Sequence, residues 1–240
     1  MSHYSVLAIG FNSKDDFESA MEVYDENRTV APYVSHTKEE IMSDAFRSRF
    51  SEETINMTPE EFYEWYSKGE TLDEKGNIIT TYNPESRWDY YSIEKEMTVS
   101  ELKKLCSEKK KKALENFDEQ LYRLQYRAIV NGTDEDKEKL QEYIKNRIDY
   151  FYLMWGIAID TFKEAYPSED EYIAHQEKVC GFSTYAALTP TGWNEPGKCG
   201  WWGLSSATAS SEKLFEEGFY ENFIEPFPDD AIAYIIDCHI

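Results

Sequence analysis

Two histidines and an aspartate near opposite ends of the 240-residue chain have the side chains of a metal site. His3 lies near the start of a short apolar run, and Asp237 and His239 lie near the end of another. If the two runs form antiparallel strands of one sheet, His3 lies opposite His239, and Asp237 shares the face of His239. Two imidazoles and a carboxylate can hold a divalent metal and leave a position open for water. The sequence leaves open the plainer alternative of two ordinary histidines at strand ends.

A second group of residues combines aromatic rings with glycines. Residues 189–203 read TPTGWNEPGKCGWWG, and residues 86–91 read SRWDYY. Flat rings on a backbone that turns sharply can stack a base or another ring, while an arginine meets a phosphate. The alternative is a hydrophobic core built around tryptophan, with glycines that permit close packing. The predicted ligand-binding residues are Arg87, Trp88, Tyr91, Trp193, Trp201 and Trp202.

The sequence carries no other signature of catalysis or of a cofactor. No pair of carboxylates is set apart by apolar neighbours that would shift a pKa. The four histidines lie outside known nucleophile signatures, and there is no glycine-rich phosphate loop. The four cysteines form no C-x-x-C pair. These patterns name no cofactor and favour a protein that is not an enzyme.

The elements that must position these residues are two apolar strands and a set of helices. Residues 2–11 (SHYSVLAIGF) and 231–240 (AIAYIIDCHI) are typical of buried strands. Over residues 98–166, apolar residues recur at helical spacing on both sides of Asn131-Gly132, which predicts two long antiparallel helices. We expect one α+β domain over residues 1–240, with a small, mainly antiparallel sheet that contains both terminal strands and with this helical hairpin inserted.

Capping boxes mark several helix starts, because a threonine is followed three residues later by glutamate. The first predicts a helix that runs to about Phe50, and the last begins the first arm of the hairpin. Residues 24–34 have no helical period and contain a proline, so we expect a loop there. The three boxes are Thr37 with Glu40, Thr58 with Glu61, and Thr98 with Glu101.

The chain is strongly acidic, with 47 Asp and Glu against 25 Lys and Arg and a net charge of −22. A field of this sign repels phosphates, so we expect no direct binding of nucleic acid, and it attracts basic protein surfaces. Solubility alone is the plainer explanation. Residues 103–112 differ from the rest, with six lysines and one glutamate, which is typical of a solvated helix face.

No segment predicts a secretion signal or a membrane anchor. Residues 1–10 lack a basic start, and their apolar run is short. No apolar stretch approaches the roughly 18 residues of a membrane span. With cysteines in no pairing pattern, we expect a soluble protein of a reducing cytoplasm.

Five segments resemble a family of uncharacterised accessory proteins found mainly in bacteriophages and in bacteria that carry prophages. In those relatives the Trp-Asp-aromatic segment continues into a glycine–arginine–tryptophan stretch, where this chain has SIEKEM (92–97). The resemblance implies an accessory protein that acts in the host cytoplasm. The segments are MSHYSVLAIG (1–10), YDEN with PYV (24–27 and 32–34), TYNPESRWDYY (81–91), TPTGWNEPGKCGWWG (189–203) and DCHI (237–240).

These observations lead to three functional hypotheses. The first is a phage-type accessory protein that binds and inhibits or modulates a host or anti-phage defence protein through its acidic surface, in a narrower form by mimicking nucleic acid. The second is a protein that binds a small ligand, such as a nucleotide signal, through the Trp/Gly-rich segment. The third is a metal-dependent hydrolase at His3, Asp237 and His239. The charge, the aromatic segments and the lack of catalytic signatures favour the first.

Overall fold

The computed structural model describes residues 3–50, 54, 56–145, 159–198 and 205–239. The chain divides into two compact units. Met1–Glu22 with Arg87–Ile240 form one, called the sheet unit below, and Val23–Ser86 form the other, called the small unit. The sequence predicts one domain over residues 1–240, because no change of composition marks the boundaries between the two units.

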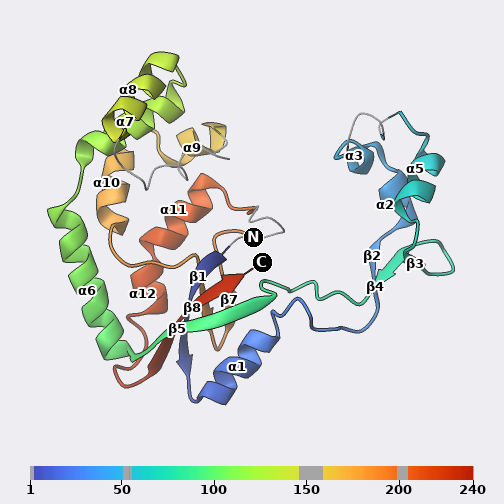
Figure 1. Ribbon diagram of the computed structural model, residues 1–240, viewed down its shortest axis with the longest axis horizontal. Helices are drawn as coiled ribbons and strands as arrows, with labels where there is room; N and C mark the ends of the chain where they lie inside the picture. Colours follow the sequence, from blue (N-terminus) through green and yellow to red (C-terminus); the bar gives the residue numbers. More distant parts are fainter. Residues whose placement is uncertain (1–2, 51–53, 55, 146–158, 199–204, 240) are drawn as a thin grey trace. The chain divides into compact units, whose positions relative to one another are not determined.

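A five-stranded sheet organises the sheet unit, in the order β5-β8-β1-β6-β7. β1 pairs antiparallel with β8 and parallel with β6, and the other neighbouring strands pair antiparallel. The expected α+β fold, with both terminal strands in a mainly antiparallel sheet, is confirmed (Figure 1). The strands are β1 (His3–Phe11), β5 (Tyr90–Thr98), β6 (Ala186–Thr189), β7 (Gly192–Asn194) and β8 (Ile232–His239).

The apolar run of β1 is buried on both faces of the sheet. Every side chain from Val6 to Ile9 is 0% exposed. A strand covered on both sides needs apolar residues without alternation, which explains the continuous run in the sequence. One face is covered by α1 (Lys14–Glu22), whose Phe17 ring stacks on Tyr234 of β8 with centroids 4.5 Å apart.

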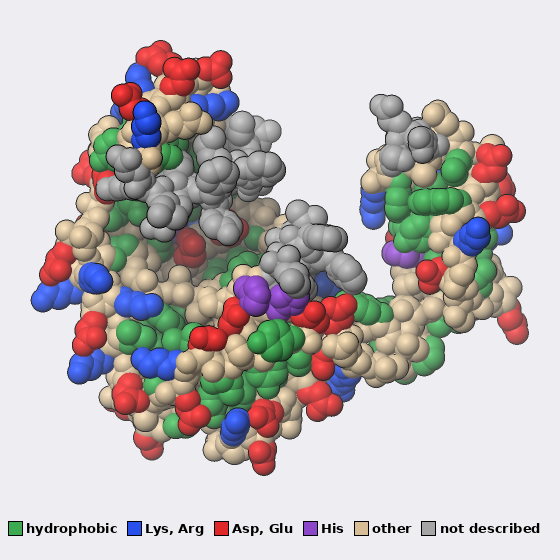
Figure 2. All heavy atoms as spheres, in the orientation of Figure 1, with side chains coloured by type: hydrophobic (Ala, Val, Ile, Leu, Met, Phe, Trp, Pro, Cys, Tyr) green, Lys and Arg blue, Asp and Glu red, His purple; other side chains and the backbone are tan. Residues whose placement is uncertain are grey.

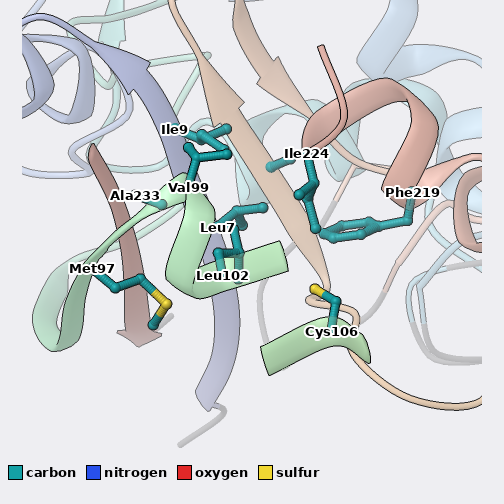
Figure 3. Packing of buried hydrophobic residues seen from close by; sticks show 10 residues of the cluster. Leu7, Ile9, Met97, Val99, Leu102, Cys106, Phe219, Ile224 and Ala233 are labelled. Carbon is teal, nitrogen blue, oxygen red and sulfur yellow. The ribbon is translucent and has the colours of Figure 1, made fainter. Parts of the chain in front are cut away.

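The opposite face of the sheet is covered by α6 (Val99–Glu115) and α12 (Phe219–Phe223), as Figure 3 shows. Both hydrogen bonds of the capping box between Thr98 and Glu101 are present, so α6 begins where the sequence predicts. This start places Val99, Leu102 and Cys106 at helical spacing on the face toward the sheet. The buried cluster consists of Leu7, Ile9, Met97, Val99, Leu102, Cys106, Ala187, Phe219, Ile224 and Ala233.

The expected helical hairpin is present, but its first arm is broken. α7 (Glu119–Val130) and α8 (Asp134–Ile144) pack through Leu124, Ala128, Leu140 and Ile144. The prediction of one continuous helix from residue 98 to the Asn131-Gly132 turn is wrong, because α6 ends at Glu115. The Asp118 side chain accepts a hydrogen bond from the backbone nitrogen of Leu121 at 3.1 Å and starts α7 anew. The middle of the second arm, residues 146–158, lies outside the described residues.

Two further helices pack against α7, and a third packs against those two. α9 (Ile159–Ala165), α10 (Glu169–Val179) and α11 (Ala209–Glu217) supply the contacts. Phe162, Ala165, Tyr166 and Tyr172 form a buried cluster between them. None of the helices in the described ranges combines the length and apolarity that a membrane span requires.

The small unit has a three-stranded antiparallel sheet and a core of its own. Its strands, in the order β2-β4-β3, are β2 (Tyr33–His36), β4 (Ile78–Thr80) and β3 (Thr71–Leu72). Its helices are α2 (Lys38–Met42), α3 (Asp44–Arg47) and α5 (Pro59–Tyr66). The buried core consists of Ile41, Phe46, Phe62 and Ile78.

Two local predictions for the small unit are wrong. The helix expected from Thr37 to about Phe50 is interrupted at Ser43, because the Ser43 side chain accepts a hydrogen bond from the backbone nitrogen of Phe46 at 3.2 Å. The loop expected over residues 24–34 ends in β2, whose Tyr33 and Val34 pair with β4. Both errors arise where a local signal for helix or loop competes with a cap or with strand pairing.

Leu102→Ala should show how strongly the packing of α6 on the sheet stabilises the fold. Leu102 is 0% exposed, so the truncation should lower the free energy of unfolding by about 2–5 kcal/mol, measured by urea denaturation. Leu214→Ala is the matched control, because Leu214 is 73% exposed, and it should change stability by less than about 0.5 kcal/mol. Equal effects would contradict this packing.

A carboxylate at the start of α10 holds that helix against α7. Glu169 accepts hydrogen bonds from Arg123 Nη1 at 2.5 Å and from Arg127 Nε at 2.8 Å. The hydrogen bonds from Arg127, opposed by burial and supported by those from Arg123, hold the pKa of Glu169 below its ordinary value. The charged form of Glu169 is therefore favoured in the folded protein.

Glu169→Gln should destabilise the protein in a pH-dependent way. Because the folded-state pKa lies below the ordinary value of 4.5, the stabilisation is complete above pH 4.5 and is lost as the pH falls through the lowered pKa. At pH 7 the variant should lose about 1.5–3 kcal/mol in urea denaturation. The difference from the unmodified protein should shrink as the pH falls below 4.5. A difference that does not change with pH would contradict the assignment.

Candidate functional site

The end of the sheet at which β1 begins and β8 ends brings the two predicted histidines together. His3 and His239 are register partners, as the sequence predicts. Their ring centroids are 5.0 Å apart, with an angle of 68° between the rings. Tyr90 of β5, the partner of His239 on its other side, continues the row. Figure 2 shows histidine side chains at the surface here, with acidic side chains beside them.

Each imidazole is held through Nδ1 by one carboxylate. His3 Nδ1 lies 2.8 Å from Asp237 Oδ2, and His239 Nδ1 lies 2.6 Å from Asp89 Oδ1. The first pair joins two predicted residues. Asp89 is a residue that sequence reasoning missed, because β5 was not expected and nothing else placed residue 89 beside His239. The aromatic segment around it was the only signal.

The pairing with carboxylates assigns the ring nitrogens. In a neutral imidazole the nitrogen that donates to a carboxylate carries the proton, and the other nitrogen has a lone pair. His239 Nε2 is buried and has no hydrogen-bond partner among the described residues, although the side chain as a whole is 15% exposed. A buried polar atom without a partner costs about 1–3 kcal/mol. Four other buried side-chain nitrogens of the described residues, His36 Nδ1 among them, share this property, but only His239 Nε2 lies beside a second carboxylate-held imidazole.

The structure assembles part of the predicted metal site. Within the described ranges, no group of three or more His, Cys, Asp or Glu side chains is arranged to hold a metal ion. Asp237 faces Nδ1 of His3, so it lies behind the imidazole rather than beside the free nitrogen. A carboxylate in this position orients a metal-binding histidine in many proteins. The site thus offers two imidazoles and two orienting carboxylates.

The predicted cationic residue of the ligand site is inside the protein. Arg87 Nε lies 2.7 Å from Glu195 Oε1, and the two side chains are only 10% and 9% exposed. Glu195 also accepts a hydrogen bond from Trp193 Nε1 at 3.2 Å. The Tyr4 hydroxyl donates to the Arg87 carbonyl. The ion pair fastens the segment after β7 to the segment before β5. The Arg87 guanidinium, which was expected to meet a phosphate, thus pairs with a carboxylate of the same chain.

The other predicted aromatic residues belong mainly to the core. Trp88 is 7% exposed, and its ring meets that of Tyr91 edge-on with centroids 4.9 Å apart. Tyr91 in turn lies 6.2 Å from Phe17 of α1. This is the alternative of a core built around tryptophan. Trp201 and Trp202 lie outside the described residues.

Described residues from four of the five segments quoted in the sequence analysis meet at this end of the sheet. Comparisons with protein-family models, with curated proteins and with solved structures found no match. The geometry alone therefore defines the candidate site. Its residues are His3, Tyr4, Arg87, Asp89, Glu195, Asp237 and His239.

A cavity of about 290 Å³ lies elsewhere in the sheet unit, between α6, the end of α10 and the junction of α11 with α12. Its lysines are engaged in the wall, because Lys110 Nζ donates to the Lys178 carbonyl at 2.6 Å and Lys178 Nζ meets Glu217 Oε2 at 3.0 Å. Burial raises the pKa of the Cys106 thiol to about 11, so it stays protonated near neutral pH. No pattern in the sequence predicts this cavity.

A buried histidine contacts two of the carboxylates that line this cavity. His175 is 2% exposed, and its Nε2 and Nδ1 each lie 3.0 Å from a carboxylate oxygen, of Glu216 and Glu217 respectively. Burial by itself raises the pKa of Glu217, but the hydrogen bonds from Lys178 and His175 outweigh it and hold that pKa below its usual value. His175 thus links α10 to α11, and we assign it a structural role.

Glu195→Ala should test the buried ion pair. Removing one partner leaves the Arg87 guanidinium buried without this carboxylate, so we expect a loss of about 3–5 kcal/mol in the free energy of unfolding. Asp229→Ala is the matched control, because the Asp229 side chain is 71% exposed and pairs with Lys103 at 2.8 Å. That loss should stay below about 1 kcal/mol in the same urea titration. Similar losses would contradict a special role for the Arg87–Glu195 pair.

Proposed function

We propose that this protein is a phage-type accessory protein that binds a basic surface of a host or anti-phage defence protein and inhibits it. The observation that carries the proposal is the net charge of −22, together with the way charge and apolar side chains are combined in the small unit. Opposite charge steers association and selects the partner, while a few buried aromatic contacts supply most of the affinity.

The small unit is acidic and also exposes apolar side chains. Residues 23–86 contain 14 Asp and Glu against six Lys and Arg, a net charge of −8. Ten large hydrophobic side chains are exposed in the described part of the chain, and half of them lie in this unit, which holds about a quarter of the residues. They are Val23, Val34, Trp65, Leu72 and Tyr82.

Trp65 of α5 has the surroundings of a binding hot spot. It is 48% exposed, while its ring lies 5.5 Å from Phe62 and 6.1 Å from Phe50. One face of the indole is thereby supported by the core, and the rest is open to a partner. Glu61 and Glu64 on the same helix are exposed. A tryptophan ring beside carboxylates suits a lysine or arginine side chain, through cation–π contact and ion pairing.

The small-ligand alternative loses its main support, because Arg87 is buried against Glu195 and Trp88 lies in the core. Trp193 donates to the same carboxylate of Glu195, and Trp201 and Trp202 are outside the described residues. The metal-dependent hydrolase needs a third ligand or a nucleophile that the described residues do not supply at the histidine pair. Neither is proposed as the main function.

Capture of a partner should depend on salt and on α5. Purified full-length protein, immobilised and incubated with bacterial lysate, should retain a basic protein whose activity falls when the purified protein is added. Raising the salt from about 0.1 to about 1 M shortens the Debye length from about 10 to about 3 Å and should release most of the partner. Trp65→Ala should weaken binding by at least about tenfold, since hot-spot residues contribute 2 kcal/mol or more.

A charge-matched pair of variants provides the control. Glu60→Lys with Glu64→Lys reverses two exposed charges on α5, and Glu138→Lys with Glu142→Lys reverses two exposed charges at the same spacing on α8. Only the α5 variant should lose the partner. Equal losses would show that net charge alone drives capture. Retention that is unaffected by salt and by all variants would overturn the proposal.

A further inference from the structure

We propose that His3 and His239 form a binding site for one borderline transition-metal ion, of the Zn²⁺, Ni²⁺ or Cu²⁺ class, through their Nε2 atoms. The site lies in the sheet unit and is independent of the partner-binding surface proposed for the small unit.

The positions of the two histidines are fixed by the sheet itself. His3 and His239 are direct partners across antiparallel strands, so their side chains leave the sheet on the same face. The next row of paired residues that faces the same way, two positions along the strands, contains Asp237 between Ser5 and Ser92. The ring centroids are 5.0 Å apart, so the two imidazoles are neighbours on that face. Backbone pairing therefore holds the two ligands together before any ion arrives.

The carboxylates hold both rings through Nδ1, so each Nε2 points away from its carboxylate. Asp237 holds His3 at 2.8 Å, and Asp89 holds His239 at 2.6 Å. Histidines that bind metals through Nε2 usually donate Nδ1–H to a carboxylate, which orients the ring and raises the basicity of the ligand nitrogen. Histidines that merely end a strand do not need such carboxylate partners, and here two histidine–carboxylate pairs lie side by side.

The second, independent observation is the unpartnered nitrogen. His239 Nε2 is buried and meets no hydrogen-bond partner in the described part of the chain. A metal ion bound there supplies the partner that a buried lone pair lacks. The His3 side chain is 53% exposed, so the ion would reach the site from solvent.

The donor atoms select the class of ion. Imidazole nitrogen suits Zn²⁺, Ni²⁺ and Cu²⁺, whereas Mg²⁺ and Ca²⁺ prefer oxygen ligands. Cys238, although next in sequence, is the register partner of Tyr4 and points to the other face, so its thiol is not a ligand. With two protein ligands identified, the remaining positions are left to water or to a ligand supplied by another molecule.

Metal titration of the full-length protein tests the site. Chelator-stripped protein is titrated with Co²⁺, whose visible absorption reports its ligands, and with Zn²⁺ in a thermal-shift assay. Excess Mg²⁺ is present throughout, because a chain of charge −22 attracts cations without specific sites. We expect one saturable ion per chain, no thiolate charge-transfer band, and a Tm that rises with Zn²⁺.

Three variants separate ligands, orienting groups and bystanders. His3→Gln should abolish the saturable absorption and the Zn²⁺-dependent rise in Tm. Asp237→Asn should weaken binding about 10–100-fold, since orienting partners have effects of this size. His36→Gln, in the small unit, should bind as the unmodified protein does.

The fold is checked by the Tm without metal, which His3→Gln should leave nearly unchanged because His3 is largely exposed. A fourth variant, His239→Gln, should abolish binding as His3→Gln does, and if it is too unstable to assay, His3→Gln and Asp237→Asn still decide the outcome. The proposal is overturned if no saturable ion binds, if a thiolate band dominates, or if His3→Gln and His36→Gln behave alike. In those cases the two histidine–carboxylate pairs serve only to hold the strand ends. Loss of the metal site would leave the result of the partner capture untouched.

Discussion

The antiparallel pairing of β1 with β8 is the constraint on which the sheet unit depends. β1 can be apolar on both faces only because β8 and β6 flank it and helices cover it from both sides. The same pairing sets His3 opposite His239 and lets Asp237 reach across the strands. A shift of one residue in the register of β8 against β1 would place His239 and Asp237 on the face opposite to His3 and separate the His3–Asp237 pair. The candidate site is therefore a consequence of register.

The predictable part of this structure was the part with strong local patterns. The two apolar terminal runs predicted their strands and even the opposition of the histidines. β5 was not predicted, because its solvent edge carries Glu94, Lys95 and Glu96, and an edge strand marked by charges looks like a loop or helix in sequence. The pairing with β8, a tertiary effect, makes it a strand. Asp89 was missed with it.

Glu195 shows a different limit. An acidic residue in a segment rich in glycine and proline carries no local sign that it will be buried, and in a chain with 47 acidic residues it is one among many. Its partner Arg87 is predicted from sequence to meet a phosphate, whereas in the structure it pairs with Glu195. Residue type says that an arginine seeks an anion, but only the packed structure decides whether this is a ligand or a carboxylate of the same chain. The same ambiguity holds for Trp88 and Tyr91, whose rings suit a core as well as a ligand.

The pairing of β1 with β8 also has a consequence for biosynthesis. His3 and Asp237 are separated by 234 positions. The central strand β1 is therefore synthesised first but can pair with β8 only after nearly all the chain between them has been translated. The small unit makes its contacts within 64 consecutive residues and can fold while translation continues. Until β8 emerges, the apolar run of β1 has no strand beside it on that side and depends on chaperones or on speed of synthesis to escape aggregation. Production of the protein should accordingly be more sensitive to growth temperature than its final stability would suggest.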